Sequence, residues 1–300
     1  MTEWVLHSGA RPGGVARAQI RAVGLALRGP AMVAGGVLVL ATALAVADMR
    51  GSTGFNFHPE RWMVPGLSGL LLPMAVWRGE ERFGPGFLWT LPVDRRGHAL
   101  AKVGAGWVWL MAAVALFVLW LLAVALASGG NVLGPETLRM IPPLPYPGDG
   151  GLNPAAITPT AWTPNPVLWL VPFTAATAMY LLSSALALAT PHPFRWLAGV
   201  LLTFFLIAMV SDAADADGVA QIPEYLVSLL VGGRYGLESV LIASTETLKV
   251  ETRLTTGEMA VVWRGLPDPA QWARSTLLWT ALAAAALWAA ASRHRETRRA

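Results

Sequence analysis

The sequence lacks cysteine altogether and carries little charge. Without cysteine the chain forms neither disulfides nor thiolate metal sites, so any part outside the cytosol is expected to be held together by packing alone. Charged residues make up only 13% of the 300 residues and hydrophobic residues 55%, whereas soluble domains carry charge on about a quarter of their positions. This composition predicts an integral membrane protein.

Charge is also absent from six apolar runs, each close to the roughly 20 residues that a helix needs to cross a bilayer. The runs are 31–47, 62–77, 103–128, 167–190, 196–211 and 275–292. We therefore expect an all-α membrane protein with six transmembrane helices. Because 62–77 and 196–211 are short, we expect each to stand upright, to borrow flanking residues, or to enter the membrane without crossing it.

None of the six runs contains an acidic, a basic or a histidine residue. Such residues mark ion and proton pathways inside membranes, so their absence argues against a proton- or sodium-coupled transporter and against a channel lined by charged rings. The sequence also has no His-Glu-x-x-His pattern and no recognisable nucleophile with its base. We assign no catalytic and no metal-binding residue.

The basic residues that are present flank the apolar runs. If both termini are cytosolic, the inside segments hold 14 Lys and Arg against 5 Asp and Glu, and the outside segments hold 8 against 13. The positive-inside rule predicts this asymmetry, and the arginines directly after the last run place the C-terminus in the cytosol. The net charge of +4 is therefore a topology signal, and we predict no nucleic-acid partner. The inside segments are 1–30, 78–102, 191–195 and 293–300.

Residues 1–30 form a basic cytosolic segment before the first run. Its arginines alternate with apolar residues such as Val15, Ile20 and Leu27, which suits a helix lying on the inner membrane surface. A solvated basic leader fits equally well. The segment is longer than the basic region of a signal peptide and further runs follow, so we expect an uncleaved first span.

Two long segments lie on the predicted outer side. Residues 129–166 carry nine prolines, and we expect an external loop without regular structure. Residues 212–274 are expected to form a small external α/β cap between the fifth and sixth spans. Within it, 222–233 is typical of a short amphipathic helix, and 247–265 of a β-hairpin with Gly257 in its turn.

The chain has 14 tryptophans, a high count. Those near the ends of runs are expected to anchor the protein at the membrane interface. The deeper ones would suit the lining of a path for an amphipathic or lipid-like substrate, but ordinary packing or lipid contact is the favoured role for each of them. The candidate path residues are Trp107, Trp169, Thr174 and Thr177.

One short connection, "GEERFGPGFLWTLPVDRRGHALAK" at residues 79–102, concentrates charge between the second and third runs. The positive-inside rule accounts for its basic residues. It does not account for the paired Glu80 and Glu81, nor for the apolar patch from Phe87 to Leu91. Charges that set the register beside apolar anchors are typical of a docking surface for a soluble partner.

The same connection resembles the coupling element of ABC-two export permeases. The resemblance lies in "EER" at 80–82, in Gly84, and above all in "LPVDRRGHALAK" directly before a long run. In that family a short cytosolic coupling helix between the second and third spans sits in a groove of the ATP-binding subunit. The "GPG" at 84–86 departs from the family's small residue followed by threonine.

The resemblance implies two roles along this connection. The residues that it places against an ATPase are Glu80, Glu81, Arg82, Phe83 and Gly84. The residues that it places in a structural turn into the third span are Leu91, Pro92, Arg95, Arg96 and Lys102.

No phosphate loop of the G-x-x-x-x-G-K-[ST] type occurs in the sequence. We therefore expect no cofactor in this chain and no enzymatic activity of its own, with ATP and Mg bound by a separate ABC ATPase subunit. The leading hypothesis is the transmembrane permease subunit of an ABC exporter, paired with an identical or related second permease subunit in the inner (cytoplasmic) membrane. The alternative is a non-transporting membrane scaffold or sensor whose external cap binds a partner.

Overall fold

The computed structural model describes most of the chain and is mostly helical. The described residues are 12–48, 57–58, 62–77, 95–132, 134–141, 157–190, 192–196, 198–199, 202–203, 206, 230, 235–243, 249–253, 259–263 and 266–293.

Four helices in the described residues are long and apolar enough to cross a membrane. The helices that supply these spans are α1 (Pro12–Asp48), α3 (Arg95–Ala127), α4 (Val171–Ala189) with the preceding 3-10 turn η5 (Pro166–Leu170), and α8 (Pro269–Arg293). Large apolar side chains stand exposed on their outer surfaces, for example Met32 and Leu277 at 73% and 71% exposure. A helix also satisfies its own backbone polar groups, as hydrocarbon requires. These features indicate a membrane-embedded protein.

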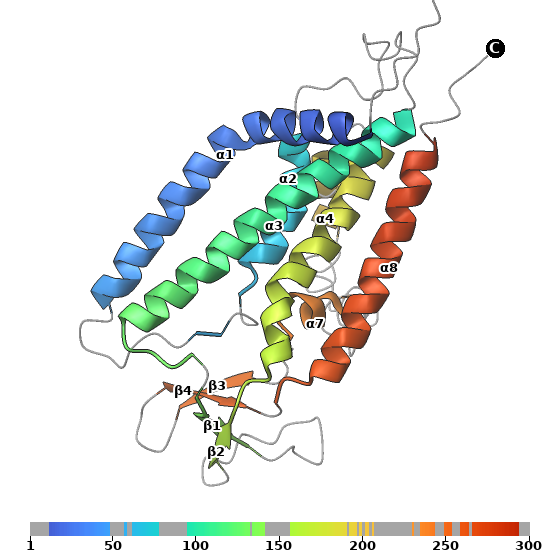
Figure 1. Ribbon diagram of the computed structural model, residues 1–300. Coiled ribbons are helices and arrows are strands. Elements are labelled where there is room, and N and C mark those ends of the chain that lie inside the picture. The colour runs from blue at the N-terminus through green and yellow to red at the C-terminus, as the bar shows by residue number, and fades with distance from the viewer. Residues whose placement is uncertain are drawn as a thin grey trace, which may run out of the picture.

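The helices form a bundle around α4, which packs against α2 (Val64–Val76), α3 and α8, whereas α1 lies outside and packs mainly on α3 (Figure 1). The end of α2, the start of α3 and the ends of α4 and α8 lie at one end of the bundle (Figure 1). We call this the connection end, because the 78–94 connection leaves and returns there. The strands lie at the opposite end, the sheet end.

The first helix is bent. Its first part lies across the connection end and its second part runs along the bundle (Figure 1). Pro30 lies inside the helix, and a proline bends a helix because it lacks an N–H donor and its ring clashes with the carbonyl four residues earlier. The predicted boundary at residue 30 therefore falls within one continuous helix. The described part of 1–30 is helical, as the surface-helix alternative requires.

The short second run forms α2, which has 13 residues. At about 1.5 Å per residue it is about 20 Å long, less than the roughly 30 Å of a bilayer core. It does not lengthen by borrowing flanking residues, since it ends at Val76. The fifth run, 196–211, lies mostly outside the described residues, so four of the six predicted spans have a full-length helix in the described part.

The prediction that 129–166 forms a loop without regular structure was wrong. These residues contribute the antiparallel strands β1 (Glu136–Met140) and β2 (Thr158–Trp162), followed by η5. The prolines allow this because β1 contains none and Pro159 lies in β2, an edge strand of the sheet. An edge strand tolerates a residue that lacks a backbone donor.

The hairpin predicted at 247–265 is confirmed. β3 (Lys249–Arg253) and β4 (Met259–Trp263) pair antiparallel, with 254–258 between them. β1 and β4 run parallel with Met140 opposite Trp263, and the Ile141 N–H donates to the Trp263 carbonyl at 2.8 Å. One four-stranded sheet of order β2-β1-β4-β3 results. It draws on both loops, so 212–274 does not supply all its strands.

The end of the predicted cap also differs from the prediction. The last helix, α8, begins at Pro269, inside the predicted cap. A six-residue helix, α7 (Leu237–Ile242), which the sequence did not suggest, packs against α4 and α8. The amphipathic helix predicted at 222–233 lies almost wholly outside the described residues.

Candidate functional site at the connection end

The predicted coupling connection begins and ends at the connection end. α2 ends at Val76, with Trp77 as its cap, and α3 begins at Arg95. The candidate ATPase contacts Glu80, Glu81, Arg82, Phe83 and Gly84 lie outside the described residues, as do Leu91 and Pro92. The site is therefore built here from the two helices that hold this connection.

Arg95, Arg96 and Lys102 lie within α3, although the sequence predicted them in a turn before the third span. Helix formation this early is reasonable, because arginine, alanine, leucine and lysine favour helices and one glycine, Gly97, costs only about 1 kcal/mol. Helix α3 therefore begins with charged turns that precede the apolar run predicted as the third span.

Lys102 is buried in the second turn of α3. Only 6% of the residue is exposed, and its Nζ atom lies 4.7 Å from the centroid of the Trp77 ring. Trp77, at the end of α2, is itself only 4% exposed. An ammonium over an indole face is attracted by about 0.5–1 kcal/mol at an exposed site and by about 2 kcal/mol when the pair is desolvated. The pair ties α2 to α3 close to both ends of the connection.

The first turn of α3 reaches two further helices. The Arg96 guanidinium carbon lies 3.4 Å from the centroid of the Trp288 ring in α8. Nδ1 of His98 lies 3.5 Å from Nε2 of Gln19 in α1. Successive side chains of α3 thus contact α8, α1 and α2.

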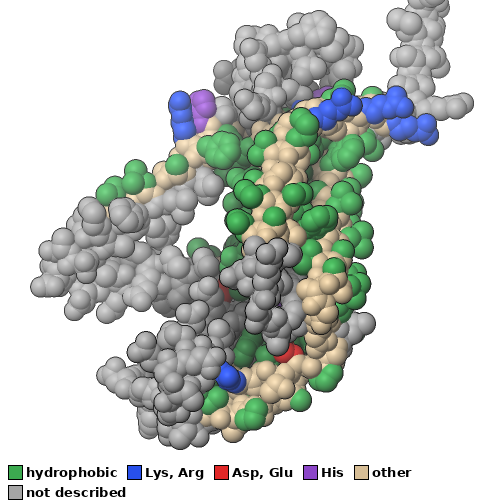
Figure 2. Space-filling model, turned by 90° about the vertical axis from the view of Figure 1, so that its left-hand side faces the viewer, with side chains coloured by type: hydrophobic (Ala, Val, Ile, Leu, Met, Phe, Trp, Pro, Cys, Tyr) green, Lys and Arg blue, Asp and Glu red, His purple; other side chains and the backbone are tan. Residues whose placement is uncertain are grey.

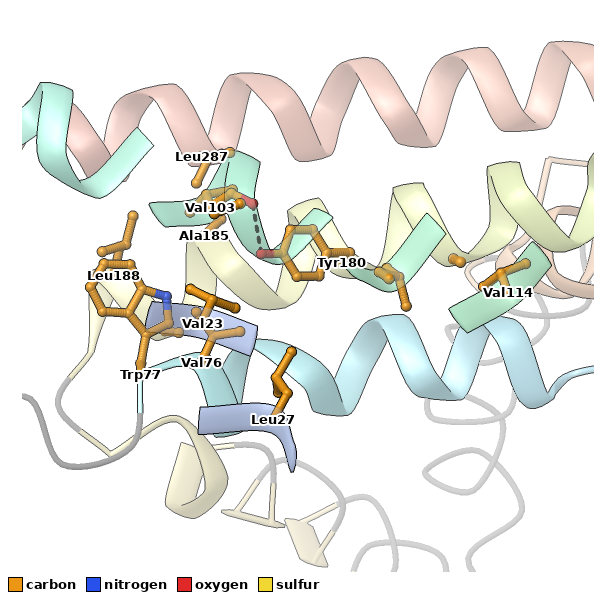
Figure 3. Close-up of a cluster of buried hydrophobic side chains, with 14 of the residues drawn as sticks. Val23, Leu27, Val76, Trp77, Val103, Val114, Tyr180, Ala185, Leu188 and Leu287 are labelled. Carbon is orange, nitrogen blue, oxygen red and sulfur yellow. Dashed lines mark hydrogen bonds between the residues drawn. The ribbon is translucent and has the colours of Figure 1, made fainter. Parts of the chain in front are cut away.

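Tyr180 connects the same region to α4. Its hydroxyl donates to the Val103 carbonyl at 2.8 Å, inside a buried cluster with side chains from α1, α2, α3, α4 and α8 (Figure 3). Gly106 makes room for this contact, because a Cβ atom there would overlap the Tyr180 hydroxyl. We call Arg96, His98, Lys102 and Val103 the α3 hub.

The partners of the α3 hub could not be singled out from the sequence. Gln19, Trp77, Tyr180 and Trp288 come from four different helices, and each pairs with a residue at least 25 positions away. Hydrophobic periodicity relates only residues that lie close together along one helix. The only indication of the α3 hub in the sequence was the group of basic residues next to the third run, which marked the start of α3.

Basic side chains gather at the connection end, where Figure 2 shows Lys and Arg over the first part of α1. The described basic side chains carried by the first part of α1, the early turns of α3, the segment after α4 and the end of α8 are Arg17, Arg21, Arg28, Arg96, Lys102, Arg195 and Arg293. The acidic side chains that the structure describes, Glu136, Glu238 and Asp268, belong to β1, α7 and the residue before α8. For such a basic end the positive-inside rule predicts the cytosolic side.

Two candidate path residues contact each other. The Trp107 indole N–H donates to the Thr177 hydroxyl oxygen at 3.1 Å, which joins α3 to α4. Trp169 lies near the other end of α4, packed edge-on against Phe57 with ring centroids 5.2 Å apart. The Thr174 hydroxyl bonds to carbonyls of its own helical turn. The four residues therefore form one pair and two separate positions, not one cluster.

Other deep tryptophans join helices. Trp109 donates to the Ile20 carbonyl at 2.9 Å and Trp120 to the Thr42 hydroxyl at 2.8 Å, so α3 is bonded to both parts of α1. Trp279 donates to the Tyr235 carbonyl at 2.8 Å. These bonds give the tryptophans the packing role that the sequence favoured over a substrate path.

A separate polar contact lies at the sheet end. Nε2 of His58 lies 2.9 Å from Oε2 of Glu136, and the His58 ring stacks on Trp162 at 6.4 Å between centroids. Nothing in the sequence indicated this pair, because its members are far apart and follow no motif. It fastens the segment before α2 to the β1–β2 hairpin.

Within the described part of the chain, no group of three or more His, Cys, Asp or Glu residues is placed to hold a metal ion. No family model, curated protein or solved structure matches this chain.

Proposed function

We propose that this chain is the transmembrane permease subunit of an ABC exporter, a multi-pass protein of the inner membrane that works with a separate ABC ATPase subunit. The observation that carries the proposal is the α3 hub. It lies directly after the connection that resembles a coupling helix, and it contacts every other long helix of the described bundle.

The hub suggests how a push on the connection reaches the bundle. A displacement of 78–94 acts on α2 at Trp77 and on α3 at Arg95, the two residues that border it. Arg96 passes the movement to α8, and the Val103–Tyr180 bond passes it to the central α4. Packed helices transmit such strain because protein interiors are dense. ATP and Mg would be held by the ATPase subunit, whose conformational cycle supplies the push.

The expected cargo is hydrophobic or amphipathic. The helices expose apolar side chains, and the polar groups along α3 and α4 are mainly indoles and hydroxyls such as Trp107 and Thr177. A second permease subunit, identical or related, would complete the path.

The decisive experiment is gentle detergent extraction followed by identification of co-purifying proteins. We expect an ATPase with a phosphate-binding loop to co-purify, and its absence would contradict the proposal. Glu81→Lys should then lower transport per ATP hydrolysed by about tenfold or more, because a reversed interface charge costs several kcal/mol. The matched control is Glu251→Lys in β3, the same charge change at the sheet end, which should leave this ratio unchanged.

A scaffold or sensor is the second candidate, favoured by the sheet that combines strands from two loops. Such a sheet offers a folded surface for a ligand or partner. A pull-down that returned a kinase or a secreted protein, without any ATPase, would support this candidate against the exporter.

A further inference from the structure

The first part of α1 carries a row of arginines that makes no ion pair with any described residue. Arg17, Arg21 and Arg28 are spaced by four and seven residues, which places them within about 40° of arc on a helix with roughly 100° per residue. All three are exposed. The row is about 17 Å long at a rise of about 1.5 Å per residue.

This row is held on a fixed support. Val23 and Leu27, only 2% and 7% exposed, anchor the same helical segment in the core cluster. The Ile20 carbonyl accepts the Trp109 indole N–H, and Gly24 lies against the same indole, where a Cβ atom would be too close. The arginines are therefore presented by a docked helix and not by a loose tail.

The position of the row along α1 indicates its depth in the membrane. Shortly after Arg28, and past Pro30, the large side chains of Met32, Val33 and Val37 are exposed and apolar. An exposed apolar surface on a membrane-embedded helix faces hydrocarbon. We therefore expect the arginine row to end where hydrocarbon begins, at the level of the lipid phosphates.

We propose that Arg17, Arg21 and Arg28 of α1 form a binding surface for the headgroups of anionic phospholipids. The guanidinium group matches phosphate in charge and offers paired N–H donors that bind two phosphate oxygens at once. The acidic side chains described in the structure lie in β1, α7 and the residue before α8, so none of them neutralises the row. This binding does not depend on the exporter proposal, since the bilayer is the partner.

The test compares lipid preference between matched double variants. The purified full chain is reconstituted in phosphatidylcholine with spin-labelled phosphatidylglycerol or spin-labelled phosphatidylcholine, and the two association constants are measured by electron paramagnetic resonance. Wild type should prefer phosphatidylglycerol at low salt. Arg17→Gln with Arg21→Gln should reduce the preference by up to about five-fold per arginine. Arg139→Gln with Arg274→Gln, from β1 and the start of α8, is the control and should keep it.

Salt provides a second measurement. The preference should shrink between 0.1 M and 1 M salt, because the Debye length falls from about 10 Å to about 3 Å. The proposal is overturned if the Arg17 and Arg21 variant keeps the wild-type preference, or if the control loses as much. It is also overturned if that variant keeps its lipid preference but no longer co-purifies with a protein partner, since the row would then be a protein-docking surface.

Discussion

Gly69 is a position of close approach between α2 and α4, and replacing it by alanine should separate these helices. Gly69 is buried, and a Cβ atom there would overlap the carbonyl oxygen of Ala176 in α4. The obstacle is backbone, which cannot rotate away as a side chain can. Next to it, the Ser183 hydroxyl of α4 donates to the Leu70 carbonyl of α2 at 2.6 Å. Small residues that allow such close approach are typical of helix interfaces in membranes.

The expected magnitude follows from three contributions. Alanine gains about 1 kcal/mol over glycine in a helix. Overpacking at a close contact costs about 1–3 kcal/mol, and loss of an interhelical hydrogen bond in a membrane protein costs about 0.6 kcal/mol on average. Gly69→Ala should therefore lower the free energy of unfolding by about 0.6–2.6 kcal/mol.

The control is Gly104→Ala in α3, where a Cβ atom would meet nothing within 4 Å. This variant has the same chemical change without the steric cost, so it should be as stable as wild type or up to about 1 kcal/mol more stable. Unfolding in mixed micelles with rising dodecyl sulfate, followed by the fluorescence of the 14 tryptophans, measures both. Equal stability of the two alanine variants would refute the close approach of α2 and α4.

Two further predictions address the hub and the orientation. Lys102→Met should lower the free energy of unfolding by about 1–2 kcal/mol in the same assay. Lys102→Arg should lower it by less, because a guanidinium also stacks on the Trp77 indole. A stabilised Lys102→Met variant would mean that burying the ammonium costs more than its contacts return. Because the chain has no cysteine, a single introduced cysteine reports on which side of the membrane it lies. A membrane-impermeant maleimide should label Thr160→Cys in intact spheroplasts, and Ala18→Cys only after permeabilisation. The reverse pattern would overturn the predicted orientation.

The long helices could be predicted from the sequence because each lies in one apolar run. The runs at 31–47, 103–128, 167–190 and 275–292 all fall on helices that can cross a membrane, α1, α3, α4 and α8. Helix boundaries were less accurate, since α1 and α3 continue into basic residues. A helix on the membrane surface or at its edge accepts charge, so the change in composition marks the bilayer boundary and not the end of the helix.

The sheet could be predicted only in part, for a different reason. The β3–β4 hairpin is local, and alternation around a glycine turn indicated it. The β1–β2 hairpin joins strands separated by a proline-rich segment, and its link to β4 depends on one register position, Met140 opposite Trp263. Pairing over such distances leaves no periodic trace in either segment.

Lys102 illustrates why the candidate site could be predicted from the sequence only in part. In the sequence it stands at the edge of an apolar run, where a lysine ordinarily extends to the membrane surface. In the structure Trp77 covers it from the end of α2, so its charge lies inside the bundle against an aromatic ring. The positive-inside rule accounts for a basic residue at this end but not for its burial. The buried cation lies between the two helices that hold the connection, so we expect its removal to change how α2 and α3 meet without changing either helix.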